Sequence, residues 1–169
     1  MSAGFDVDAF GDRGGELTKR CVVVSIYEDI GGRDLLFQVC DSLVSKFKDE
    51  VDFEVDWWRF KYLADPEIAT EAAKKATQAD LILLAARSSQ LQLHVQGWFE
   101  GWLPNREAGD GALVLVQPSP HGASHSLHLR SYLRLTAQRA HLDYFSLSQP
   151  GPTDLPADEY RPMHWGINE

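Results

Sequence analysis

The residues best suited to chemistry lie in two short polar segments, each of which follows an apolar stretch. Glu28 and Asp29 come directly after the apolar segment 21–27, and Arg87 and Ser88 follow the apolar segment 81–86. Two adjacent carboxylates suit a divalent cation such as Mg²⁺, with water as the remaining ligands. An arginine beside them can bind an anion. These four residues are the candidate ligand-binding site, and Glu28 and Asp29 are weak candidates for a metal site.

Apolar segments that alternate with helical patterns must position this site. The runs 22–24, 81–84 and 113–116 are continuously apolar, which is typical of strands covered on both faces. The segment 52–57 alternates acidic with apolar residues, which indicates a strand with one wet face. We therefore predict an α/β three-layer sandwich with a five-stranded parallel sheet of order 2-1-3-4-5, a flavodoxin-like arrangement. At its switch point the carboxyl ends of the first and third strands meet, so we expect the four residues to lie together.

Three segments are predicted along the chain. Residues 1–18 show no sustained period and are expected to form a mobile tail, and residues 19–148 carry the α/β domain. Residues 149–169 are Pro-rich and lack a helical period, so a regular fifth helix is not expected. A frayed tail is one interpretation of this last segment. Met163, Trp165 and Ile167 favour the other, a strap that packs on the sheet near the first helix.

Composition limits the classes of partner and location. A net charge of -9 argues against nucleic-acid binding, because phosphate contacts need a basic surface. No apolar stretch approaches the length of a membrane span, and no signal peptide begins the sequence, so no membrane partner is expected. Cys21 and Cys40 have no ligand spacing and are expected to be reduced thiols. The expected location is cytoplasmic.

The acidic pair at the end of the first strand resembles the metal-binding acids of response-regulator receiver domains. This resemblance covers the alternation of elements over residues 21–148. It implies a phosphoacceptor aspartate at the end of the third strand, where the chain has Leu84-Ala85-Ala86-Arg87. The lysine and the Ser or Thr that it implies after the later strands are replaced by Gln149 and Gln117. The sequence therefore predicts a receiver-like module that is not competent for aspartyl phosphorylation.

Flavodoxins offer the next comparison. Their phosphate loop is rich in Ser, Thr and Gly, with amides directed at the anion. The segment 25–29 instead places two negative charges where an FMN phosphate would sit, and Gly31-Gly32 is not a dinucleotide fingerprint. The sequence thus predicts no cofactor beyond weakly held Mg²⁺.

Several segments also resemble a group of uncharacterised bacterial proteins. They are Tyr27-Glu28-Asp29, Trp58-Arg59-Phe60, Ala79-Asp80-Leu81-Ile82, the pair Trp98 and Trp102, and the closing segment 164–169. The resemblance implies a bacterial origin and a single fold, and it transfers no catalytic residue.

The helical segment 126–140 carries a second candidate site. It contains Arg130, Arg134 and Arg139, and no acidic residue occurs between His121 and Leu142. Arg130 and Arg134 are four residues apart and share a helix face. We predict that these arginines contact a protein partner or another copy of the chain. The alternative is a solvated helix face.

Gly97 and Gly101 flank Trp98 and Trp102 in the preceding helical segment. Because glycine costs helix stability, the sequence predicts that close packing compensates for it.

The leading functional prediction is a non-enzymatic interaction module in bacterial signalling or regulation. The alternative is a small hydrolase or transferase that uses Glu28, Asp29 and Arg87 around a metal or anion. No nucleophile triad assembles in the sequence, since Ser88-Ser89 lacks the GxSxG elbow. The sequence leans towards a protein without catalysis.

Overall fold

The computed structural model describes residues 19–88, 90–106, 109–118 and 127–149. Strands and helices alternate through these residues. The elements in chain order are β1 (Lys19–Tyr27), α1 (Ile30–Phe47), β2 (Val51–Arg59), the 3-10 helix η2 (Phe60–Ala64), α2 (Pro66–Gln78), β3 (Leu81–Ala85), α3 (Leu93–Trp102), the 3-10 helix η3 (Leu103–Asn105), β4 (Ala112–Pro118), α4 (Leu127–Arg139) and β5 (Asp143–Gln149).

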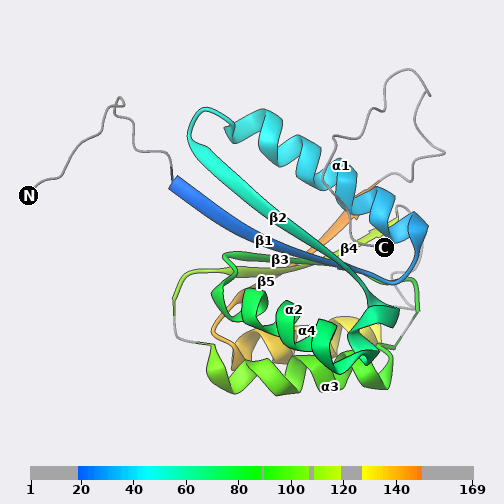
Figure 1. The fold of residues 1–169 in the computed structure, drawn as a ribbon. Coiled ribbons are helices and arrows are strands. Elements are labelled where there is room, and N and C mark those ends of the chain that lie inside the picture. The colour runs from blue at the N-terminus through cyan, green and yellow to red at the C-terminus, as the bar shows by residue number, and fades with distance from the viewer. Residues whose placement is uncertain (1–18, 89, 107–108, 119–126, 150–169) are drawn as a thin grey trace, which may run out of the picture.

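The five strands form one parallel sheet in the order β2-β1-β3-β4-β5, which confirms the predicted topology. Helix α1 lies on one face of this sheet, and α2, α3 and α4 lie on the other (Figure 1). Strands β1, β3 and β4 are internal, and their central residues are mostly apolar because helices cover both of their faces. Strands β2 and β5 form the two edges.

Side-chain caps fix where two helices begin. Asp65 accepts hydrogen bonds from the backbone N–H groups of Glu67 and Ile68, and Pro66 occupies the first turn of α2. Asp29 caps α1 in the same way by accepting from the N–H of Gly32 at 2.9 Å. A Cβ at Gly32 would lie 3.0 Å from the Cβ of Ala85, so the start of α1 packs tightly against the end of β3.

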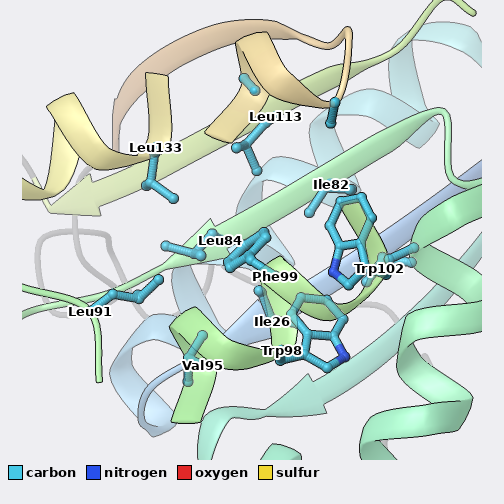
Figure 2. Packing of buried hydrophobic residues seen from close by; sticks show 14 of the residues in the cluster. Ile26, Ile82, Leu84, Leu91, Val95, Trp98, Phe99, Trp102, Leu113 and Leu133 are labelled. Carbon is cyan, nitrogen blue, oxygen red and sulfur yellow. The ribbon is translucent and has the colours of Figure 1, made fainter. Parts of the chain in front are cut away.

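Two apolar clusters, one on each face of the sheet, make up the core. The larger lies beneath α2, α3 and α4 and contains the side chains of α3 that face the sheet, among them Trp98, Phe99 and Trp102 (Figure 2). The smaller lies beneath α1 and includes Trp57, whose ring meets that of Phe37 edge-on at 4.8 Å. The two tryptophans of α3 therefore pack inside the protein's own core.

The glycines of α3 do not serve close packing, which corrects the prediction from sequence. Gly97 and Gly101 are exposed, and a Cβ added at either would meet no atom within 4 Å. We expect Gly97→Ala and Gly101→Ala each to raise the free energy of unfolding by about 0.5–1 kcal/mol, because alanine restricts the unfolded chain and favours helix. Urea unfolding measures this. An unchanged or lower midpoint would show that these glycines have another role.

Several predictions fall on residues outside the described ranges. The tail 1–18 and the strap that follows β5, with Met163, Trp165 and Ile167, belong to them, and so does the place of a fifth helix. None of the helices in the described ranges is long and apolar enough to cross a membrane.

Candidate functional site

The structure brings together the four residues that the sequence placed at the carboxyl end of the sheet. The carboxylate of Glu28 accepts hydrogen bonds from the N–H groups of Arg87 and Ser88, at 2.7 and 3.2 Å, and from the hydroxyl of Ser88 at 2.7 Å. The guanidinium of Arg87 lies 3.4 Å from the carboxylate of Asp29. The end of β1 is thereby tied to the loop that follows β3.

These contacts leave little of the acidic pair for a ligand. Glu28 is bound by three donors of the protein, and Asp29 caps α1 and pairs with Arg87. Within the described ranges no group of three or more His, Cys, Asp or Glu side chains is placed to hold a metal ion. These residues therefore hold the loops after β1 and β3 together. This arrangement gives no support to the hydrolase or transferase hypothesis.

Strand β3 ends without an acidic residue at the position that phosphotransfer requires. Ala85 pairs with Tyr27 of β1 and Val116 of β4, and Ala85 and Ala86 are both buried. The side chain after them is that of Arg87, which is exposed. The residues at the end of β3 itself therefore supply no carboxylate to accept a phosphoryl group.

The three arginines of α4 divide between two sides of the helix. Arg139 forms a two-point ion pair with Glu100 of α3, with nitrogen–oxygen distances of 2.7 and 3.0 Å, and this pairing lowers the pKa of Glu100. Arg134 lies on the opposite side, with its guanidinium 5.6 Å from the ring centre of Tyr144 on β5. Arg139 thus serves the contact between α3 and α4, whereas Arg130 and Arg134 face the β5 edge.

The positive charges of Arg130 and Arg134 have no acidic partner in the part of the chain that the structure describes. The Nε of Arg130 is buried and has no hydrogen-bond partner there. Burial raises the pKa of Tyr144, and the two nearby arginines partly oppose this shift. The side of α4 next to β5 therefore carries a local positive charge on an acidic protein.

Strand β5 has a structural feature that was not predicted from the sequence. Its neighbour in the sheet is β4, and its other edge is unpaired among the described residues. Phe145 and Leu147 on this strand are 55% and 37% exposed. They pair with Val114 and Val116, which belong to the core under α1, so they project on the α1 side of the sheet.

The strand at the opposite edge of the sheet, β2, differs from β5 in its charge. Strand β2 carries Asp52, Glu54 and Asp56 at alternate positions, and charges on an edge strand discourage pairing with another chain. Glu54 is bound by Arg20 and Lys75. The central residues of β5, 144–148, carry no charge. That lack of charge in an edge strand was the signal available in the sequence.

We define Arg130, Arg134 and the edge of β5 with Phe145 and Leu147 as the α4–β5 surface.

A hollow of about 550 Å³ lies at the amino end of the sheet, away from both predicted sites. Its walls combine apolar side chains such as Leu43 and Phe53 with the charged groups of Arg20 and Asp80. Partial burial raises the pKa of the Cys21 thiol at its wall.

Comparison with known proteins places the fold. No family model matches the sequence, and neither does any curated protein. Among solved structures, two-electron reduced flavodoxin from Megasphaera elsdenii matches with a TM-score of 0.50 and 13% identity over 80% of this chain and 90% of that chain. General stress protein 14 from Treponema denticola, solved in complex with FMN, matches with a TM-score of 0.42 and 13% identity over 76% of this chain and 86% of that chain.

These matches correct the prediction about cofactors. The sequence predicted none beyond weak Mg²⁺, yet the fold matches that of a flavodoxin. The prediction of no cofactor is therefore wrong, because it set aside the likeness of this fold to that of a flavodoxin. The residues of the β1–α1 loop fit a phosphate poorly. Asp29 already caps α1, and Glu28 already accepts hydrogen bonds from the backbone N–H groups of Arg87 and Ser88. A phosphate at this loop has to displace Glu28. The chain is a flavodoxin-like α/β protein in fold.

Proposed function

We propose that this chain is a protein-interaction module whose α4–β5 surface binds an extended, acidic segment of a partner protein in a signalling or regulatory assembly. The observation that carries the proposal is the outer edge of β5, which is unpaired among the described residues and uncharged at 144–148, next to Arg130 and Arg134, which have no acidic partner among those residues. A second copy of the chain is the rival occupant.

The unpaired edge supplies the affinity. An exposed strand presents a row of backbone N–H and C=O groups, and an extended peptide that pairs with them adds a strand to the sheet. Phe145 and Leu147 offer apolar contact on the α1 side of that added strand. Phe145 and Leu147 are already partly covered, so burying the rest of their surface contributes about 1 kcal/mol each.

The arginines supply the selectivity. Tyr144 and Ser146 pair with Leu113 and Leu115 of the other core, so alternate positions of β5 face α4. Side chains of an added strand alternate in the same way. One face of the partner segment would meet Phe145 and Leu147, and the other would meet Arg130 and Arg134. A segment that alternates apolar with acidic residues matches both faces.

A labelled (Glu-Val)5 peptide tests the proposal by fluorescence anisotropy. We expect it to bind at low salt and to weaken as salt rises, because exposed charges are screened over about 8 Å at physiological ionic strength. The double substitution Arg130→Glu and Arg134→Glu should weaken binding about tenfold or more, since two attractive contacts become repulsive. It should leave the circular dichroism spectrum unchanged.

Two controls make this result specific. The double substitution Lys48→Glu and Lys61→Glu makes the same charge change at exposed positions elsewhere and should leave binding unchanged. A Glu5Val5 block peptide has the same charge but lacks the alternation and should bind more weakly. Equal loss with both double substitutions, or equal binding of both peptides, would contradict the proposal. Sedimentation of the peptide-free protein as a dimer that Arg130→Glu and Arg134→Glu dissociate would favour the second copy.

Flavin binding is the second candidate function, and the flavodoxin likeness favours it. The loops after β1 and β3 meet at the switch point of the sheet, where ligands of open α/β sheets bind. Glu28 and the phosphate of a flavin would compete there for the N–H groups of Arg87 and Ser88. The charge of Glu28 should then control the affinity for FMN.

A further inference from the structure

Every second residue of β5 carries a hydroxyl group on the side of the sheet that faces α4. These residues are Tyr144, Ser146 and Ser148. The first two pair with leucines of the core beneath α2, α3 and α4, and the third follows in the same alternation. The one acidic residue of the strand, Asp143, alternates with them and so projects on the α1 side. This side of β5 therefore offers hydrogen-bond donors and no negative charge.

The two arginines of the α4–β5 surface lie beside these hydroxyls. The guanidinium of Arg134 is 5.6 Å from the ring centre of Tyr144. Helix α4 leads from the carboxyl end of β4 to the amino end of the parallel strand β5, so it runs antiparallel to β5. Four residues of helix rise about 6 Å, and two residues of strand rise about 6.6 Å. Arg130 is therefore level with Ser146 when Arg134 is level with Tyr144.

The phenol of Tyr144 lies among these groups. Burial raises its pKa, and Ser146, Arg130 and Arg134 partly oppose this shift, which places all three side chains near the phenol oxygen. That oxygen has no hydrogen-bond partner in the part of the chain that the structure describes. Helix α4 contributes no acidic side chain. Two guanidiniums and two hydroxyls thus lie close together, and neither α4 nor this side of β5 supplies an anion to bind them.

We infer that Arg130, Arg134, Tyr144 and Ser146 bind a phosphorylated serine in the extended segment that pairs with β5. The inference rests on the proposed function and names the chemistry of the partner. A phosphoryl group carries a charge of about −1.5 to −2 at neutral pH and three strong acceptor oxygens. One such group matches both guanidiniums and still has an oxygen for the hydroxyls. A carboxylate has one charge and two oxygens, so it leaves part of this cluster unmatched.

A peptide with phosphoserine in place of the third glutamate of (Glu-Val)5 tests this inference by fluorescence anisotropy. At pH 7.5 we expect it to bind at least tenfold more tightly than (Glu-Val)5. This advantage should shrink at pH 5.5, because the second pKa of the phosphate is about 6. Equal affinity of the two peptides at pH 7.5 would overturn the inference and leave the proposed function standing. Binding of the phosphopeptide alone would support the inference and contradict the proposed recognition of an unmodified acidic segment. Failure of both peptides to bind would overturn both.

Two double substitutions separate phosphate recognition from general attraction of charge. Tyr144→Phe with Ser146→Ala removes both hydroxyls without a change of charge. It should weaken binding of the phosphopeptide at least fivefold and change that of (Glu-Val)5 less than twofold. Tyr62→Phe with Ser45→Ala makes the same chemical changes on η2 and α1 and should alter neither affinity.

Arg130→Lys with Arg134→Lys keeps the charge but removes the forked donors that bind phosphate oxygens in pairs. It should also weaken the phosphopeptide more than (Glu-Val)5. Equal losses for the two peptides in both double substitutions of the cluster would overturn the inference, because the cluster would then bind any negative charge alike.

Discussion

Replacing Phe99 with alanine should lower the free energy of unfolding by about 3–5 kcal/mol, the usual cost of deleting a buried phenyl ring. Phe99 has no exposed surface, and its ring centre lies 5.0 Å from that of Trp98 and 5.7 Å from that of Trp102. Figure 2 shows it between α3 and the sheet, with Leu84 close by. The surrounding tryptophans are themselves fixed by neighbours, so the cavity cannot collapse fully.

Leu93→Ala is the matched control, because Leu93 belongs to the same helix and is 81% exposed. We expect it to change stability by about 0.5 kcal/mol or less. Denaturant unfolding followed by far-UV circular dichroism measures both variants. If Phe99→Ala cost no more than Leu93→Ala, α3 would not pack on the sheet as described.

Replacing Glu28 should have the second largest effect. Glu28→Ala removes the acceptor of three hydrogen bonds and leaves two N–H groups of the β3–α3 loop to water, so we expect a loss of about 2–3 kcal/mol in the free energy of unfolding. Glu28→Gln keeps one acceptor oxygen and should cost about half as much.

The Glu28→Gln variant also tests whether Glu28, besides holding the two loops together, competes with the phosphate of a flavin. Glu28→Gln removes a negative charge that would stand beside a phosphate, so we expect it to bind FMN about tenfold more tightly than the unsubstituted protein. Quenching of flavin fluorescence reports the affinity. Equal FMN affinity in both proteins would place any flavin away from this loop. Ser88→Ala, which keeps both backbone amides, should lie between Glu28→Gln and the unsubstituted protein in stability.

The sheet could be predicted from the sequence because burial leaves a direct pattern in it. A strand covered on both faces needs apolar residues at every position, as in 81–84, whereas the edge strand β2 alternates. The order of the strands followed from these differences. The order of the strands places the ends of β1 and β3 side by side at the switch point. It therefore predicted that Glu28 and Ser88 lie together.

The contacts made at the sites could not be predicted in this way. Backbone amides carry no sequence signal, so nothing showed that those of Arg87 and Ser88 would already bind Glu28. Glu100 and Arg139 are 39 residues apart, and their pairing depends on how α3 and α4 lie on the sheet. Arg139 was grouped with Arg130 and Arg134 because it belongs to the same helix, and this could not reveal its partner on α3.

Hydrogen exchange across β5 tests the central proposal most directly, because a strand added to the edge must bind backbone groups of β5. With a saturating (Glu-Val)5 peptide, amides within Asp143–Gln149 should exchange at least tenfold more slowly than in the protein alone, and this protection should disappear in the protein with Arg130→Glu and Arg134→Glu. Binding that leaves exchange in β5 unchanged, or that protects only the loops after β1 and β3, would contradict a docking role for the α4–β5 surface.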